Sequence, residues 1–381
     1  MASRTSNEIK ETLKLAKIEE SDLKSFSQTL YFSKEFSSSE YSLVELPPDV
    51  VLALKNQDEV CIRGRKDDNA ILCTKSNTYT VKEAEVSNSM LLSDNLTFPD
   101  GFNNSKDVNY VSLNSLNFNY YELKKTVANK RRIEQILKDN PYIGKSSEKN
   151  MTKYTTEDLK KEIQASEREI LKGLEDIKAC EIEGYWRLIN IDYIKTILDA
   201  IINFKEENSW EIDEIDFNEC SSVLGEIYPS TIIEHIIKSY LKREDETNRY
   251  TLRSEEFVKF IAIYLLTNAA EFNLKEFLTV WKQLLPEGIA DMAKASLLNG
   301  IALVRDQGIP SICYFPISKL PEKVDERFSA LFQMKEKWKF DEILPYIRDL
   351  DDDESKLISI LNKYTRSSQV DGVKMYSHKH I

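Results

Sequence analysis

The spacing of apolar residues changes near the middle of this 381-residue chain. In the first part, short runs of β-branched and aromatic residues alternate with turn-forming stretches, a pattern typical of β-strands. The predicted strands are Ser27–Phe32, Tyr41–Leu46, Glu59–Ile62, Ala70–Thr74, Thr78–Ala84, Ser89–Leu92 and Val108–Leu113. From Thr156 onward, apolar residues recur every three or four positions, as on the buried face of an α-helix. The sequence therefore predicts an α+β protein with a β-rich first half and a mostly helical second half.

The predicted strands are short and closely spaced, which indicates a β-barrel or a β-sandwich. Such a sheet has edges, and an exposed edge strand accepts a strand from another chain. A helix is expected over Tyr121–Leu137, and the polar segment 144–153 is expected to be a linker. We therefore predict a β-barrel-like, partner-binding domain over residues 1–143.

The second half repeats one order of elements. Thr156 is expected to cap a first helix, and Ser166 with Glu169 three residues later has the pattern of a capping box. A strand-like run and another striped helix follow, and the same order returns after Pro229. Units of about 55 to 60 residues with this content are typical of winged helices. Three are predicted, over residues 154–210, 211–271 and 272–381, with a plain helical bundle as the alternative.

The charge of the chain limits its partners. The net charge of −12 argues against a protein coated with nucleic acid, since phosphate binding needs concentrated Lys and Arg. One local basic cluster comprises Lys124, Lys125, Lys130, Arg131 and Arg132. This cluster is either a solvated helix face or a patch for nuclear import or nucleic-acid contact.

A second basic cluster lies near the C-terminus. It comprises Lys363, Arg366, Lys374 and Lys379. On a last helix followed by a wing, these residues have the arrangement that winged-helix proteins use against a phosphate backbone. A solvated tail is the alternative.

The sequence offers no catalytic site. Gly144-Lys145-Ser146 imitates a phosphate-binding loop, but a carboxylate, Asp139, stands where the loop needs its first glycine. His235 has no Cys or His partner in helical register, so a structural role is predicted for it. We predict no catalytic residue, no metal ligand, no cofactor and no small-molecule substrate.

The five cysteines are scattered and include no CxxC pair, which favours reduced thiols in a nuclear or cytosolic protein. The longest apolar run, Phe260–Leu266, is too short to span a membrane, and the N-terminus lacks the apolar core of a signal peptide. A soluble intracellular protein without a membrane partner is expected.

Several motifs in the chain resemble those of a known family, the sister chromatid cohesion proteins named for defective sister chromatid cohesion, number one. The motifs in the β-rich half are Leu72–Ser76 and Ser87–Leu92. Those in the helical half are Lys153–Leu159, Gln164–Glu167, Gly184–Arg187, Val280-Trp281, Leu285–Gly288, Glu326–Ser329, Leu331-Phe332, Glu336–Trp338, Ile343–Ile347 and Lys363-Tyr364. The resemblance extends over nearly the whole chain.

The resemblance implies a non-catalytic subunit of the alternative, cohesion-linked replication factor C clamp loader, which acts in the nucleus and loads the sliding clamp (PCNA). It implies that the N-terminal half completes a β-barrel with chromosome-transmission-fidelity factors eighteen and eight. It also implies three winged helices that bind the catalytic subunit of DNA polymerase epsilon and, weakly, DNA. We place the polymerase contact at Tyr185, Trp186 and Arg187 of the first winged helix.

One departure from the family bears on DNA binding. Some members have a densely basic C-terminal tail, whereas here Ser367–Asp371 interrupts the charge. About four exposed cations give weak, salt-sensitive binding unless partners contribute. The alternative function is a stand-alone winged-helix DNA-binding protein.

Overall fold

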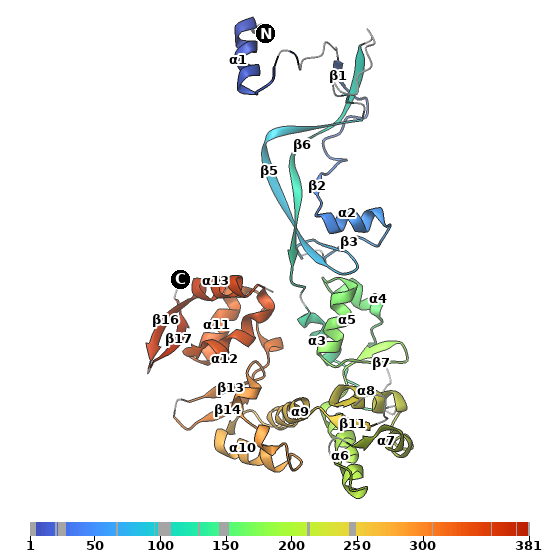
Figure 1. Ribbon diagram of the computed structural model, residues 1–381, viewed down its shortest axis with the longest axis vertical. Helices are drawn as coiled ribbons and strands as arrows, with labels where there is room; N and C mark the ends of the chain where they lie inside the picture. Colours follow the sequence, from blue (N-terminus) through green and yellow to red (C-terminus); the bar gives the residue numbers. More distant parts are fainter. Residues whose placement is uncertain are drawn as a thin grey trace. The chain divides into compact units, whose positions relative to one another are not determined.

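The computed structural model describes residues 5–19, 21, 28–65, 68–94, 96–97, 108–128, 130–144, 152–211, 214–243, 249–306, 308–351, 353–370 and 372–379 (Figure 1). It confirms a mixed α+β protein. The chain divides into two compact units. The first contains residues 1–55 and 80–124, and the second contains residues 56–79 and 125–381.

The first unit is built on two long strands, β5 and β6. Its elements are α1 (Ser6–Leu15), β1 (Gln28–Phe32), β2 (Val44–Glu45), α2 (Pro48–Lys55), β5 (Thr78–Ser93) and β6 (Asn109–Thr126). Both β1 and β2 pair with β6 in parallel. With β3 (Cys61–Arg63) and β4 (Ile71–Cys73), the strand order is β1-β6-β5-β4-β3. Within the described residues this sheet is open and does not close into a barrel.

One prediction in this region is wrong, and one helix was not predicted. The expected helix over Tyr121–Leu137 is the end of β6 followed by a shorter helix, α3 (Arg131–Lys138). Tyr121 continues the sheet because its N–H donates to the carbonyl of Leu43. Helix α2 was not expected, although Pro48 suits a first helical turn and Val50 and Ala53 bury one face.

The second unit repeats one element order four times in the described residues: a helix, a short extended segment, one or two further helices and a two-stranded hairpin. The first repeat contains α3, α4 (Thr156–Glu162), α5 (Glu167–Asp176), β7 (Cys180–Ile182) and β8 (Tyr185–Arg187). The second contains α6 (Ile191–Glu207), β9 (Ile215–Asp216), α7 (Phe217–Leu224), α8 (Ser230–Tyr240), β10 (Leu241–Arg243) and β11 (Arg249–Leu252).

The third and fourth repeats follow directly. The third contains α9 (Ser254–Thr267), β12 (Phe272–Asn273), α10 (Leu274–Gln283), the 3₁₀ helices η4 (Ala290–Met292) and η5 (Ala295–Leu298), β13 (Ala302–Arg305) and β14 (Ser311–Tyr314). After η6 (Ile317–Lys319), the fourth contains α11 (Val324–Met334), β15 (Lys337–Lys339), α12 (Phe340–Ile347), η7 (Arg348–Leu350), α13 (Glu354–Tyr364), β16 (Thr365–Val370) and β17 (Val373–His378).

The same strand pairing closes each repeat. The segment after the first helix pairs antiparallel with the second strand of the hairpin, as β9 with β11, β12 with β14 and β15 with β17. In the first repeat a single bridge, Tyr154 to Trp186, takes that place. The elements of the second unit thus recur as four repeats whose first helices begin at Arg131, Ile191, Ser254 and Val324, where the sequence predicted three modules.

Helix caps show how the sequence places these elements. Ser166 and Glu169 form the predicted capping box of α5. The cap of α4 is Thr155, which pairs with Asp158, and not the predicted Thr156. Thr155 has an extended backbone and accepts a hydrogen bond from the N–H of Asp158, as an N-cap must.

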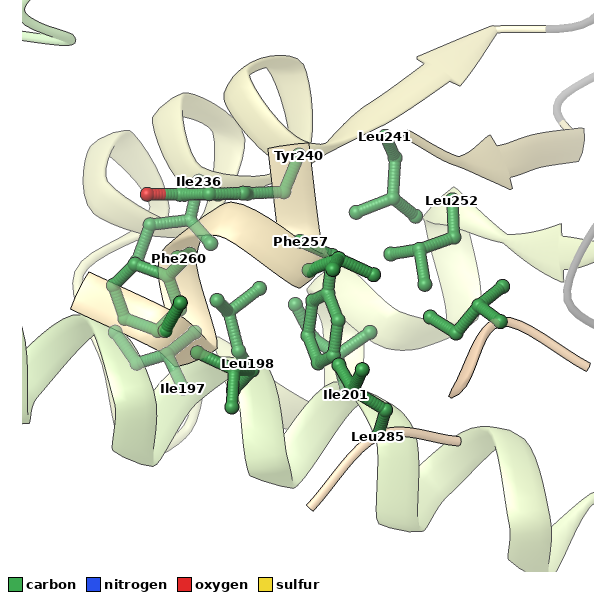
Figure 2. Packing of buried hydrophobic residues seen from close by; sticks show 14 of the residues in the cluster. Ile197, Leu198, Ile201, Ile236, Tyr240, Leu241, Leu252, Phe257, Phe260 and Leu285 are labelled. Atoms are coloured by element: carbon green, nitrogen blue, oxygen red, sulfur yellow. The ribbon is translucent and has the colours of Figure 1, made fainter. Parts of the chain in front are cut away.

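Large apolar side chains form three buried clusters in the described part of the second unit, and two of them join neighbouring repeats. Figure 2 shows Ile197, Leu198 and Ile201 of α6 packed with residues of α8 and α9. The same cluster reaches from Tyr142 to Ile312, and a second cluster joins β13 and β14 to the fourth repeat. A third cluster lies within the first repeat. Of the expected linker 144–153, residues 145–151 lie outside the described residues.

His235 lies on α8, half-buried, with Nε2 2.9 Å from the carbonyl oxygen of Lys178. Burial lowers the pKa of His235 below its usual 6.5. The charges of Lys238 and Lys178 also lower this pKa, whereas the hydrogen bond to the Lys178 carbonyl raises it. The imidazole is therefore neutral in the folded protein at neutral pH, and its hydrogen bond connects α8 to the carbonyl of Lys178.

This burial makes stability pH-dependent. As pH falls from about 7 to about 5, the unfolded chain takes up a proton on His235 before the folded chain does, so the free energy of unfolding should fall. His235→Gln, which retains a polar side chain without this titration, should show a flatter profile in urea unfolding at several pH values. Parallel profiles for the two proteins would contradict the assignment.

Candidate partner-binding and nucleic-acid surfaces

The four C-terminal cations predicted to contact DNA lie around one three-stranded sheet. Lys363 is in the last turn of α13, Arg366 is on β16, Lys374 is on β17 and Lys379 follows β17. The N–H of Lys379 donates to the carbonyl of Tyr364, which ties the end of the described chain to the helix. The first three side chains are exposed and that of Lys379 is half-buried.

These cations do not share one face. Opposed residues of an antiparallel pair point to the same side of a sheet. Arg366 opposes Ser377, whereas Lys374 shares its side with the buried Tyr376 and lies over that ring at 5.2 Å. Arg366 therefore projects from the outer face, and Lys374 projects from the side that packs on the helices.

The outer face carries two lysines that sequence reasoning missed, Lys337 and Lys339 of β15. Lys337 opposes Ser377, which in turn opposes Arg366, so the two cations stand in one row across the sheet. The signal in the sequence is the alternation Lys-Trp-Lys, in which Trp338 is buried and both lysines are exposed. The surface formed by Lys337, Lys339 and Arg366 is called the outer cationic face below.

One member of the other basic cluster, Arg131, is buried rather than solvated. Arg131 has only 9% of its side chain exposed and lies 2.5 Å from Asp349, and it donates to the carbonyls of Leu320 and Pro321. Arg327, also buried, donates to Asp349 at 2.7 Å. Burial lowers the pKa of Arg131, and the Asp349 carboxylate opposes that shift. Arg131 thus joins the first repeat to the fourth rather than facing solvent.

The three residues predicted to contact a polymerase form β8. Tyr185 is half-buried, with Lys153 5.5 Å above its ring. The indole N–H of Trp186 donates to Thr156 Oγ1 at 3.0 Å. Arg187 is 3% exposed, and its Nε donates to the carbonyl of Asn140 at 3.2 Å. Tyr185 and Trp186 are both half-buried and keep some surface for a partner, whereas Arg187 joins the hairpin to the segment that follows α3.

Nucleophilic and metal-binding groups are sparse. All five cysteines are free thiols, and four of them are buried. Burial raises the pKa of Cys73 to about 11 and that of Cys220 to about 12, which keeps both as unreactive thiols. Among the described residues, no group of three or more His, Cys, Asp or Glu side chains is placed to hold a metal ion. No described helix is both long enough and apolar enough to cross a bilayer.

The first unit exposes apolar surface along an unfinished sheet. The three residues of β4 cover only the start of the 16-residue β5, so the rest of that edge has no partner strand among the described residues. Exposed apolar side chains on its strands, between 42% and 66% exposed, are Leu30, Tyr31, Phe32, Val44, Leu91, Tyr110 and Phe118. All three hydrophobic clusters lie in the second unit.

Arg187→Ala should destabilise the β7–β8 hairpin by about 2 kcal/mol, because it removes a buried guanidinium that donates to the half-buried carbonyl of Asn140. Hydrogen–deuterium exchange of amides in residues 180–190 should then be more than about tenfold faster. Tyr185→Ala, with its half-exposed ring, is the matched control and should change exchange little. Unchanged protection in the Arg187 variant would mean that the hairpin does not depend on this contact.

Comparison with known proteins identifies the family. The family model described as sister chromatid cohesion protein Dcc1 matches residues 41–347. The human sister chromatid cohesion protein DCC1 is 35% identical over 389 residues, covering 99% of this chain and 98% of its own. The mouse protein is 34% identical with the same coverage, and the Saccharomyces cerevisiae protein is 22% identical over 90% of this chain and 97% of its own. The chain therefore belongs to the sister chromatid cohesion protein Dcc1 family.

Proposed function

We propose that this chain is a non-catalytic scaffold subunit of an alternative replication factor C clamp loader, acting in the nucleus in sliding-clamp (PCNA) loading and sister chromatid cohesion. Its proposed partners are chromosome-transmission-fidelity factors eighteen and eight and the catalytic subunit of DNA polymerase epsilon. Membership of a cohesion protein family supports the cohesion role. The loader, its subunits and the polymerase come from the family resemblance of the sequence.

The observation that carries the proposal is the open sheet of the first unit. A two-stranded ribbon is only marginally stable in water, and a sheet needs further strands or a packed face to be stable. Here β5 and β6 are long, most of the β5 edge is unpaired in the described residues, and the unit holds none of the three hydrophobic clusters. Strands from partner chains would complete the hydrogen bonding and cover the exposed apolar residues.

The four repeats of the second unit are proposed to be winged helices. Each has the first helix, the further helices and the hairpin of that fold. In repeats two to four a short strand pairs with the second hairpin strand, and in the first repeat the Tyr154–Trp186 bridge takes its place. In this assignment the repeats begin at α3, α6, α9 and α11, so the C-terminal segment 272–381, predicted as one module, contains parts of two. A row of such modules gives several separate surfaces for binding a polymerase and DNA.

Co-expression tests the scaffold. The full chain, made alone, should be aggregation-prone, and it should elute as one stoichiometric complex when made with factor eight and the C-terminal segment of factor eighteen. Leu91→Glu, on the strand whose edge is unpaired, should weaken this complex because it places a charge on a surface that the partner covers. Lys238→Glu, on α8 of the second unit, is the control and should leave the complex intact. A soluble monomer that ignores both partners would overturn the proposal.

A second candidate function, DNA binding by this chain alone, is favoured by the outer cationic face. Lys337→Glu with Arg366→Glu should weaken binding to duplex DNA about tenfold. The slope of log K against log salt concentration should become shallower by about two, because two phosphate contacts are lost. Lys374→Glu, which changes the opposite side of the hairpin, should have a smaller effect. Equal losses for both proteins, measured by fluorescence anisotropy at several salt concentrations, would show that the outer face has no special role.

A further inference from the structure

The third repeat departs from the other three at one place. In repeats one, two and four the last helix before the hairpin has ten or eleven residues, as α5, α8 and α13. In the third repeat the two short 3₁₀ helices η4 and η5 stand there instead. A groove of about 780 Å³ lies between α10 and the segment that joins η4 to η5.

The floor of this groove is apolar. Leu274 and Leu278, one turn apart on α10, form one wall, and Ala293 and Ala295 form the other. Because two alanines occupy the second wall, its side chains leave space that larger residues would fill. Pro310, in the β13–β14 loop, closes one end, and its carbonyl accepts a hydrogen bond from the N–H of Leu274.

The rim of the groove is cationic. Lys275 and Lys282 of α10 and Lys294 of the opposite wall line it, and its lining contains no acidic residue. All three lysines are exposed, and no carboxylate of the described chain forms an ion pair with them; the nearby Glu271 pairs with Arg305 instead. In a chain whose net charge is −12, this is a local concentration of positive charge around apolar surface.

We propose that this groove binds an acidic amphipathic helix of a partner protein. Lys275 and Lys282 are seven residues apart, so their helix positions differ by about 10 Å along the axis. A partner helix with carboxylates at positions i and i+7 and large apolar residues at i+3 and i+4 presents all four on one face, with the same spacing. The carboxylates meet the lysines, and the apolar residues enter between Leu278 and the two alanines.

The chemistry of the groove favours a peptide over nucleic acid. Single strands bind through bases stacked on aromatic side chains, and the lining contains no aromatic residue. A duplex backbone would meet mostly apolar surface between the lysines, and the hydroxyl of Thr279 there already donates to the carbonyl of Lys275. The proposal concerns a surface apart from the first-unit sheet and does not depend on the clamp-loader assignment.

The test uses the full chain, co-expressed with factor eight and the C-terminal segment of factor eighteen if it aggregates alone, and a display library of random fifteen-residue peptides. Selection on the wild-type chain, with counter-selection on Lys275→Glu/Lys282→Glu, should enrich peptides with two acidic residues about seven positions apart and leucine, isoleucine or methionine between them. By fluorescence anisotropy these peptides should bind the double variant at least about tenfold more weakly and lose affinity with salt.

Lys238→Glu/Lys242→Glu is the matched control, since it makes the same change of charge on exposed lysines of the second repeat and should bind like wild type. Circular dichroism checks that the double variants fold. Enriched peptides that lack acidic residues, or that bind both double variants equally, would overturn the proposal. It is also overturned if the groove variant loses binding to a 20-base-pair duplex while no acidic peptide is selected.

Discussion

The stability of the second unit depends on apolar surface that neighbouring repeats share. A module of about 60 residues buries too small a fraction of its surface to be more than marginally stable alone. Here one cluster runs from Tyr142 to Ile312, through parts of three repeats, and a second joins Leu303 and Cys313 to the fourth. Each repeat therefore has its own strand pairing, but neighbouring repeats share buried apolar side chains. The first unit has no equivalent cluster among its described residues, and this contrast underlies its proposed dependence on partner chains.

Buried arginines add specificity to this packing. Arg187 and Arg327 are 3% and 2% exposed, and each donates to backbone carbonyls, at Asn140 and Pro321 respectively. A guanidinium can satisfy several acceptors in a fixed planar geometry, so each arginine orients the segment that it contacts. Basic residues in this chain consequently serve two purposes, and position in the fold, not charge alone, separates structural cations from those that reach solvent.

Much of the helical half could be predicted from the sequence, because period and caps are local signals. The stripes of α6, α8 and α9 and the capping box at Ser166 are present as expected. The residues from Tyr121 carry both apolar and basic side chains, which is typical of a helix, and their extended form depends on pairing with β2 and β5, which are distant in sequence. Likewise, the sequence could not show that Arg366 and Lys374 face opposite ways, since that depends on the register of β16 and β17.

The link between Arg131 and Asp349 has a consequence for mapping functions by deletion. Asp349 is the carboxylate beside both Arg131 of the first repeat and Arg327 of the fourth. A chain shortened to remove its last repeat would strip Arg131 of its counter-ion and of the carbonyls of Leu320 and Pro321, leaving an unneutralised guanidinium at the base of α3. If such a chain lost one of the proposed polymerase or DNA interactions, the loss could have two causes. Either the deleted fourth repeat makes the contact, or its deletion has damaged the first repeat. Charge-reversing substitutions of exposed lysines separate the two effects, because they leave the ion pair between Arg131 and Asp349 intact.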